Sequence, residues 1–138
     1  MRTLHFGLRV ADLDRSLAFY TAVGYEIAGS VPETPLGRLI MLKLPGDEFV
    51  TIELVHDPAN GKVNSGAGLS HFVIKVESLD AATSELAARG IEVEAPAAPD
   101  DSDDVRTTWM TDPDGNRIEL VQWPAGHADG MTAADFRQ

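Results

Sequence analysis

The sequence predicts an α+β fold made of two tandem βαβββ modules. One observation behind this prediction is an internal repeat: when the chain is laid on itself with a shift of 66 residues, His5 falls on His71 and Glu53 falls on Glu119 without a gap. The other is the order of elements. Each half presents an alternating strand, a capped helix that closes at a glycine, and three short strands.

The length of the chain fits one domain. With 138 residues, it has a common size for a unit with a single core. We therefore expect a single domain over residues 1–138, in which module 1 covers about 1–66, module 2 covers about 67–123, and a tail follows over 124–138.

The first module begins with a strand and a helix. Residues 4–10 alternate between apolar and other side chains, which is typical of a half-buried strand and places His5 and Arg9 on one face. Asp12 is the expected N-cap of a helix of about three turns, and Gly24 is its expected C-terminal end. Three short strands are then expected at 25–31, 38–44 and 49–55.

The second module repeats this order. Residues 71–76 alternate as a strand, Ser78 is the expected N-cap, and Gly90 closes a helix that the i,i+4 pair Glu85 and Arg89 supports. Further strands are expected at 91–94, 105–111 and 117–122, with a turn over 112–115 before the last one.

The composition excludes several classes of protein. Hydrophobic residues make up 43% and charged residues 24%, which excludes a disordered or collagen-like chain. The absence of cysteine excludes disulfides, thiolate zinc sites and a cysteine nucleophile. A net charge of -11 repels phosphate backbones and anionic membranes, so we expect neither nucleic acid nor a membrane as partner.

The first residues and the apolar runs bear on location. No apolar run approaches the roughly 20 residues that span a bilayer, and the N-terminal segment lacks an apolar signal-peptide core. We expect a soluble cytoplasmic protein.

The repeated His and Glu residues are the candidate site. Glu53 and Glu119 each lie between two apolar residues of a predicted strand, so both carboxylates point away from the apolar face. If the modules pack about a pseudo-twofold axis, these carboxylates and the imidazoles of His5 and His71 converge, and the mixed sheet curves around a metal site. Nitrogen and oxygen donors suit Zn, Ni, Co, Fe or Mn.

The alternative for each of these residues is an ordinary core or solvated side chain. Packing alone gives no reason to keep an ionisable pair twice in one register, because a buried carboxylate is costly unless it is paired or bound to a metal. The repetition therefore favours the metal site.

Other candidates are weaker. His56 and His127 are expected to be solvated, and the acidic residues of 100–104 lack the spacing of a calcium loop. Trp109 and Trp123 are large enough to line a pocket, but packing or a subunit contact explains either residue equally well. No nucleophile elbow and no glycine-rich nucleotide motif occurs, so nothing indicates a hydrolase or a nucleotide-binding protein.

Four segments resemble bacterial glyoxalase I (lactoylglutathione lyase), within the vicinal oxygen chelate superfamily, which includes bleomycin resistance proteins and dioxygenases. The likeness covers about residues 1–123, and its segments are LHFGLRVADLDRSLAFYTAVGYE, IELVHD, LSHFVIKV and DPDGNRIEL. The resemblance implies the doubled βαβββ fold. It also implies a metal set at His5, Glu53, His71 and Glu119.

The resemblance further implies an isomerisation. Its substrate is a hemithioacetal of methylglyoxal and a thiol, usually glutathione, which passes through an enediolate to a lactoyl thioester. Glu119 is the implied base, and Glu53 serves the opposite face of the substrate. His5 as the first ligand resembles the nickel- or cobalt-preferring branch, with zinc as a further possibility.

The departures from the family concern the thiol. Arg9 matches the arginine that holds a glutathione carboxylate in the family. The family's other glutathione-binding positions hold Asp57, Ala67 and the acidic residues of 100–104. Like-charge repulsion disfavours glutathione there, so we expect a thiol with fewer negative groups or a different α-oxygenated substrate.

Three other superfamily roles stay open, and the resemblance also bears on assembly. An acyl-CoA epimerase resembles sequences with Gln in place of Glu53, and a dioxygenase keeps fewer protein ligands. An antibiotic-binding protein of the bleomycin-resistance type needs no catalytic ligands.

We also expect a homodimer with sites at the subunit interface, although the chain has enough modules to complete a site internally.

Overall fold

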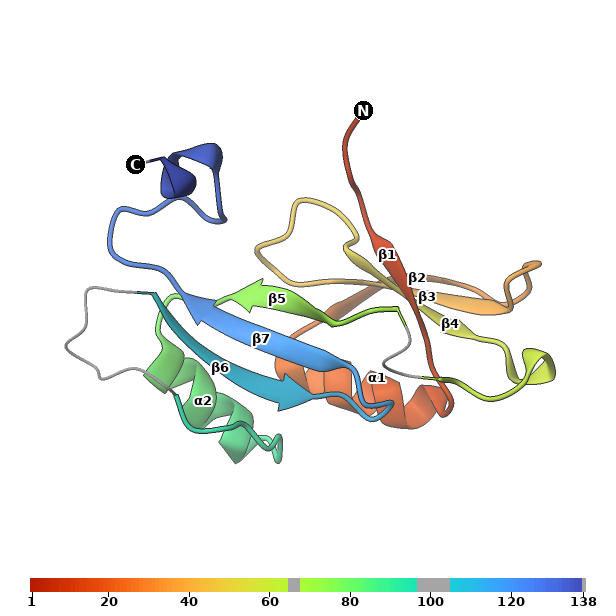
Figure 1. Cartoon of the computed structure of the whole chain (residues 1–138). Helices are drawn as coiled ribbons and strands as arrows, with labels where there is room; N and C mark the ends of the chain where they lie inside the picture. The colour runs from red at the N-terminus through yellow and green to blue at the C-terminus, as the bar shows by residue number, and fades with distance from the viewer. Residues whose placement is uncertain (65–67, 97–104, 138) are drawn as a thin grey trace. The chain divides into compact units, whose positions relative to one another are not determined.

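The protein forms two compact units, and the computed structural model describes residues 1–64, 68–96 and 105–137 of them (Figure 1). The first unit comprises Met1–Gly68 together with Asp112–Gly115, and the second comprises Leu69–Thr111 together with Asn116–Gln138. The predicted α+β class is confirmed. That the two modules make one domain stays a prediction.

The first unit is built on a four-stranded mixed sheet. Its strands run in the order β1-β4-β3-β2, with β1 parallel to β4 and the other neighbours antiparallel. The elements are β1 (Phe6–Arg9), α1 (Leu13–Val23), β2 (Glu26–Val31), β3 (Arg38–Lys43), β4 (Ile52–His56) and the 3-10 turn η1 (Pro58–Asn60).

The second unit carries a three-stranded sheet in the order β5-β7-β6, with β5 parallel to β7 and β6 antiparallel to it. Helix α2 lies against β6 and β7 (Figure 1). The elements are β5 (His71–Lys75), α2 (Leu79–Ala88), β6 (Arg106–Thr111), β7 (Arg117–Gln122) and the 3-10 turn η2 (Ala133–Phe136).

Both helices begin and end where the sequence predicts. The Asp12 side chain accepts a hydrogen bond from the backbone N–H of Arg15, and the Ser78 hydroxyl accepts one from Ala81. Gly24 (φ 127°) and Gly90 (φ 82°) follow the helices in a backbone conformation that other residues rarely adopt. The chain therefore turns out of each helix at the same point of the repeat.

The strand register repeats between the units. Phe6 is opposite Ile52 in the first sheet, and Phe72 is opposite Ile118 in the second, which keeps the predicted shift of 66 residues. The antiparallel neighbours β3 and β6 follow a shift of 68 residues instead. Arg38 of β3 is opposite His56, whereas Arg106 of β6 is opposite Gln122, which is the equivalent of His56. The repeat is thus strict for the first and last strands of each module and shifted by two residues for the strand between them.

The strand expected at 91–94 is not formed, which corrects the sequence prediction. Glu94 donates one backbone hydrogen bond to Trp109 on β6 (2.9 Å) and its carbonyl accepts one from the Thr108 hydroxyl. By contrast, β2 pairs with β3 along its length. Pro96 has no N–H to donate, so the segment has little means of extending its single ladder bond.

Each unit has an apolar core on one face of its sheet. In the first unit Leu8, Ile52 and Leu54 are nearly inaccessible to solvent, as are Ile74, Ile118 and Leu120 in the second. These residues alternate along their strands with the residues of the opposite face. That opposite face carries the predicted ligands.

The turn Asp112–Gly115 is fastened to the helix of the first unit. The hydroxyl of the fully buried Tyr20 donates to Oδ2 of the buried Asp112 (2.6 Å), and Asp114 accepts from the backbone N–H of Ala11 (3.1 Å) and the Ser16 hydroxyl (3.3 Å). Burial, and then the negative charge of Asp112, raise the pKa of Tyr20. This turn is therefore a tertiary anchor as well as a reversal of the chain.

The C-terminal segment folds back on the second unit. The imidazole of His127 stacks on the Trp123 ring, with centroids 4.4 Å apart, and its Nε2 lies 2.6 Å from Asp135 Oδ1. Trp123 Nε1 donates to the Asp129 carbonyl, and the Asp129 carboxylate contacts Lys75 of β5. His127, which was expected to be solvated, is partly shielded by these contacts, with 19% of its side chain exposed.

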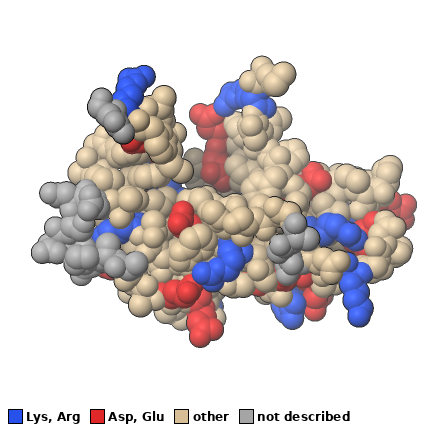
Figure 2. All heavy atoms as spheres, in the orientation of Figure 1, with Lys and Arg blue, Asp and Glu red and all other residues tan. Residues whose placement is uncertain are grey.

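Charged side chains of both signs lie on the face seen in Figure 2. Acidic and basic side chains are interspersed there, so the excess of negative charge does not gather in one patch of the residues drawn.

None of the helices in the part of the chain described above has the length and apolar character to span a bilayer.

Removing the Tyr20 hydroxyl should destabilise the protein. We expect Tyr20→Phe to lower the free energy of unfolding by about 1.5–3 kcal/mol, because the bond to the buried Asp112 carboxylate is lost. Tyr25→Phe is the matched control, and urea unfolding is the measurement. Equal losses in the two variants would contradict the anchoring role of the Tyr20–Asp112 bond.

The stability of the contacts that hold the C-terminal segment on the second unit should depend on pH. Hydrogen bonds to the Ala128 carbonyl and to Asp135 raise the pKa of His127. The stability that protonated His127 contributes is therefore fully present below its unfolded pKa of about 6.5 and is lost as pH rises through the folded pKa. A bond from the Thr132 backbone and one from His127 lower the pKa of Asp135, so its contribution is lost as pH falls through that pKa. Following the His127 ring protons by NMR, we expect a titration midpoint above about 6.5 that Asp135→Asn lowers; an unmoved midpoint would refute the pairing.

Candidate functional site

The first unit brings one imidazole and one carboxylate together. His5 directly precedes β1, and Glu53 lies on the parallel neighbour β4, opposite Gly7. Because His5 and Gly7 are two residues apart on an extended chain, His5 and Glu53 share one face of the sheet. His5 Nε2 lies 3.3 Å from Glu53 Oε2, and the two side chains are 40% and 16% exposed. The pair is therefore close, and open to solvent on the imidazole side.

The second unit repeats the placement. His71 begins β5, and Glu119 on β7 is opposite Val73, which again puts the imidazole and the carboxylate on one face. Trp109 on β6 is opposite Glu119 and joins the same face. Ile118 and Leu120, the neighbours of Glu119, are buried on the other side, as the sequence predicted.

His71 has two close neighbours of its own. Its Nδ1 lies 2.9 Å from the hydroxyl of Ser70, and its ring meets the Trp109 ring edge-on with centroids 5.1 Å apart. The guanidinium of Arg117 lies over the Trp109 ring at 5.0 Å and pairs with Glu94 at 2.8 Å. The imidazole of His71 therefore contacts Ser70 and Trp109, and Trp109 in turn contacts Arg117.

The donor chemistry fits a divalent ion. Each unit offers an imidazole nitrogen and a carboxylate oxygen on one sheet face, and these suit Zn, Ni, Co, Fe or Mn. Among the described residues, no three His, Asp or Glu side chains gather closely enough to hold a metal ion. One unit alone supplies two donors, so a complete ligand set requires both pairs.

Two cations occupy equivalent positions on these faces. Arg9 lies four residues after His5, and Lys75 lies four residues after His71. Lys75 Nζ is 2.6 Å from Asp129 and 3.1 Å from Glu77. The bond to Asp129 raises the pKa of Lys75 and lowers that of Asp129. The cation of the second unit is thus already neutralised by the chain's own carboxylates.

The structure places the weaker sequence candidates away from the His/Glu pairs. His56 ends β4 on the face opposite Glu53, and Asp57 pairs with the Asn60 side chain. Trp109 lies beside His71, whereas Trp123 packs against the C-terminal segment. Ala67 and the acidic residues of 100–104 lie outside the described residues.

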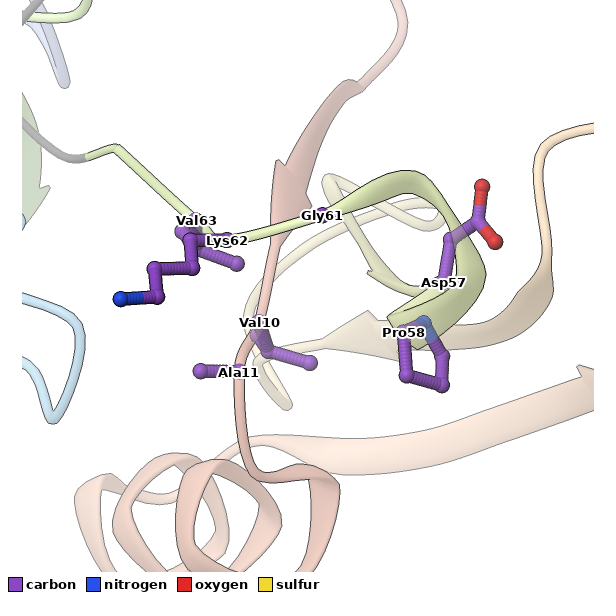
Figure 3. Close-up of a pocket in the computed structure, with 7 residues that line it drawn as sticks. All are labelled: Val10, Ala11, Asp57, Pro58, Gly61, Lys62 and Val63. Carbon is purple, nitrogen blue, oxygen red and sulfur yellow. The ribbon is translucent and has the colours of Figure 1, made fainter.

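A cavity of about 510 Å³ lies elsewhere in the first unit, where β1 ends against the segment after β4 (Figure 3). The close-up shows the Asp57 carboxylate and the Lys62 amine pointing to opposite sides. The cavity contains none of the four predicted ligands, and its lining consists of Val10, Ala11, Asp57, Pro58, Gly61, Lys62 and Val63.

Sequence reasoning missed three contacts that bear on these faces. The contact of Ser70 with His71 is one, and its signal in the sequence is a hydroxyl directly before a candidate ligand histidine. The pairing of Lys75 with Asp129 joins residues 54 positions apart, and no local pattern indicates it. The contact between Trp109 and His71 was equally invisible before the register of β6 was known.

Comparison with known families gives one match over most of the chain. Residues 2–120 match the model of the glyoxalase/bleomycin resistance protein/dioxygenase superfamily. The match includes all four predicted ligands.

Curated relatives carry a common description. The probable lactoylglutathione lyase of Vibrio parahaemolyticus is 32% identical over 124 residues, which cover 88% of this chain and 90% of that protein. The probable chloroplastic lactoylglutathione lyase of Arabidopsis thaliana is 30% identical over 124 residues, and the chain spans 35% of its length.

Solved structures share the fold. The trypanothione-dependent glyoxalase I of Leishmania major is 26% identical with a TM-score of 0.68, and the match covers 88% of this chain and 86% of that one. TnmS3, an antibiotic-binding protein from Streptomyces sp. CB03234, is 24% identical with a TM-score of 0.65, covering 91% and 98%. The latter likeness concerns the fold alone.

Proposed function

Because this chain belongs to the glyoxalase/bleomycin resistance protein/dioxygenase superfamily, we propose that it is a metal-dependent lyase of the glyoxalase I type. Its substrate is the hemithioacetal of methylglyoxal and a thiol, and its product is a lactoyl thioester. The observation that carries the proposal is the His5–Glu53 contact of 3.3 Å, together with the recurrence of the same residue types at His71 and Glu119 in the same parallel register. Lactoylglutathione lyases among the relatives support this reaction class.

The proposed metal ligands are His5, Glu53, His71 and Glu119. Nickel or cobalt is the favoured ion, and zinc is a further candidate. The ion supplies Lewis-acid stabilisation of negative charge on the two adjacent substrate oxygens. The four ligands come together either within one chain or between the chains of a homodimer that has its sites at the subunit interface. We place the enzyme in the cytoplasm.

The carboxylates of Glu119 and Glu53 are proposed to act as the bases that transfer the proton. Glu119 removes the proton from the carbon that bears the sulfur and returns it to the neighbouring carbon, and Glu53 serves the opposite face of the substrate. Glu53 is suited to such a task because it is mostly shielded from water yet lies on the open sheet face beside His5. In this proposal Glu119 and Glu53 therefore serve both as metal ligands and as the groups that carry the transferred proton.

The charge of the two faces favours a thiol other than glutathione. Lys75 is engaged by Asp129 and Glu77, and Arg117 on the same face is paired with Glu94. Arg9 is the residue proposed to receive a carboxylate of the thiol. Asp57 adds negative charge after β4. A thiol with fewer carboxylates than glutathione is therefore favoured by like-charge repulsion.

A small-molecule binding protein of the antibiotic-resistance type is the second candidate. The open faces carry exposed or half-buried apolar side chains, among them Val73 with 46% of its surface exposed and Trp109. Such side chains suit a large apolar ligand. An acyl-CoA epimerase is less favoured, because the second ligand position holds Glu53.

Metal binding tests the ligand set. We expect nickel-loaded protein to retain one ion per chain. His5→Ala and Glu119→Gln should lower the nickel affinity by more than about 100-fold, because losing a side chain that binds the ion costs more than the 10- to 100-fold effect of losing a residue that only contacts a ligand. Elemental analysis after gel filtration and chelator competition measure this. His56→Ala, on the opposite face of β4, is the matched control; unchanged metal content in the ligand variants would overturn the site.

Thioester formation tests the reaction. Nickel-loaded protein, given methylglyoxal and a panel of thiols, should form a thioester that absorbance detects, with glutathione as a poorer thiol than less acidic ones. Glu119→Gln should slow turnover by about 100- to 10,000-fold through loss of the base, whereas Glu26→Gln on the edge strand β2 should not. No thioester with any thiol, together with tight binding of an apolar antibiotic, would favour the second candidate.

A further inference from the structure

The Nδ1 atom of His71 is already engaged by its neighbour. The Ser70 hydroxyl oxygen lies 2.9 Å from Nδ1, at the point where the chain enters β5. A serine hydroxyl both donates and accepts, so it can take a proton that sits on Nδ1. If it does, the lone pair of Nε2 is free for a cation.

The Trp109 ring restricts the same imidazole from the side. The two rings meet edge-on, with planes at 71°, and Trp109 is itself covered by the Arg117 guanidinium at 5.0 Å. Arg117 is held in turn by Glu94 and by the Thr111 hydroxyl at 3.0 Å. This row of contacts limits rotation of the His71 ring about its side-chain bonds.

We propose that Ser70 and Trp109 are positioning residues that orient His71 for metal binding through Nε2, with Ser70 accepting the Nδ1 proton. The proposal rests on the proposed metal site and names residues that no ligand pattern includes. Neither residue touches the ion; each acts through the imidazole. Hydrogen bonds of this kind from outside the ligand shell set both the tautomer and the ring plane of ligand histidines.

The first unit orients its imidazole differently. The repeat places Leu4 where Ser70 stands, and Met41 is opposite Glu53 as Trp109 is opposite Glu119. His5 lacks a preceding hydroxyl and a facing indole, but its Nε2 points at the Glu53 carboxylate. The two halves thus direct Nε2 by different contacts. Loss of Ser70 therefore affects one histidine only.

Metal affinity is the first readout. We expect Ser70→Ala to weaken zinc binding by about 10-fold in chelator competition, within the range known for outer-shell contacts, and Ser70→Thr to restore it because the hydroxyl returns. Ser84→Ala, an exposed serine on α2, is the matched control. Equal affinity in the wild type and Ser70→Ala would overturn the proposal while leaving the metal site intact. Failure of the wild type to bind zinc, nickel or cobalt would overturn both.

A spectroscopic readout separates positioning from a general loss of structure. In zinc-loaded protein, the Nδ1 proton of His71 should exchange with solvent more slowly than in Ser70→Ala, as its ¹H–¹⁵N signal reports, and Ser70→Thr should restore the slower exchange. Cobalt should quench the fluorescence of Trp123→Phe, which keeps Trp109, far more than that of Trp109→Phe. Equal Nδ1 exchange rates in the wild type and Ser70→Ala, or equal quenching in the two tryptophan variants, would refute the assigned contacts.

Discussion

The parallel pairing of the first and last strand in each module is the constraint on which the candidate site depends. Parallel neighbours cannot be joined by a tight turn, so the chain passes through a helix and then two strands in the first module, or one strand in the second, before the ladder closes. That ladder puts Gly7 opposite Glu53 and Val73 opposite Glu119. Residues 48 positions apart in the chain, such as His5 and Glu53, thereby reach one sheet face, and the core stays on the other.

The two modules share this frame but differ on their open faces. His5 faces a carboxylate, whereas His71 stands between a hydroxyl and an indole. The cation of the second face is paired with Asp129 of the C-terminal segment, a carboxylate with no counterpart in the first module. The open faces of the two units are therefore chemically distinct, although their strand registers match.

The turn Asp112–Gly115 illustrates how one short motif serves two purposes. Gly115 (φ 89°) permits the reversal, and its backbone N–H closes the turn on the Asp112 carbonyl at 3.0 Å. The Asp112 and Asp114 carboxylates then accept hydrogen bonds from two side chains of α1 and from the backbone N–H of Ala11, which precedes the N-cap Asp12. Local turn chemistry predicts the reversal, while the partners of these carboxylates are a matter of tertiary structure.

The sequence by itself determined the repeat, the class of fold, the capping residues Asp12 and Ser78, and the faces to which Glu53 and Glu119 belong, because periodicity and capping act over a few residues. Only the tertiary structure decided that 91–94 stays out of the sheet, that His127 packs on Trp123, and that Ser70 and Trp109 flank His71. The pairing of 91–94 and the contact of Trp109 with His71 depend on segments distant in sequence, whereas the contacts of Ser70 and Trp123 involve near neighbours whose side-chain orientation a local pattern does not specify. For Trp109 and His71 the sheet register supplies the missing information, since it sets which side chains of separate strands share a face and lie near each other.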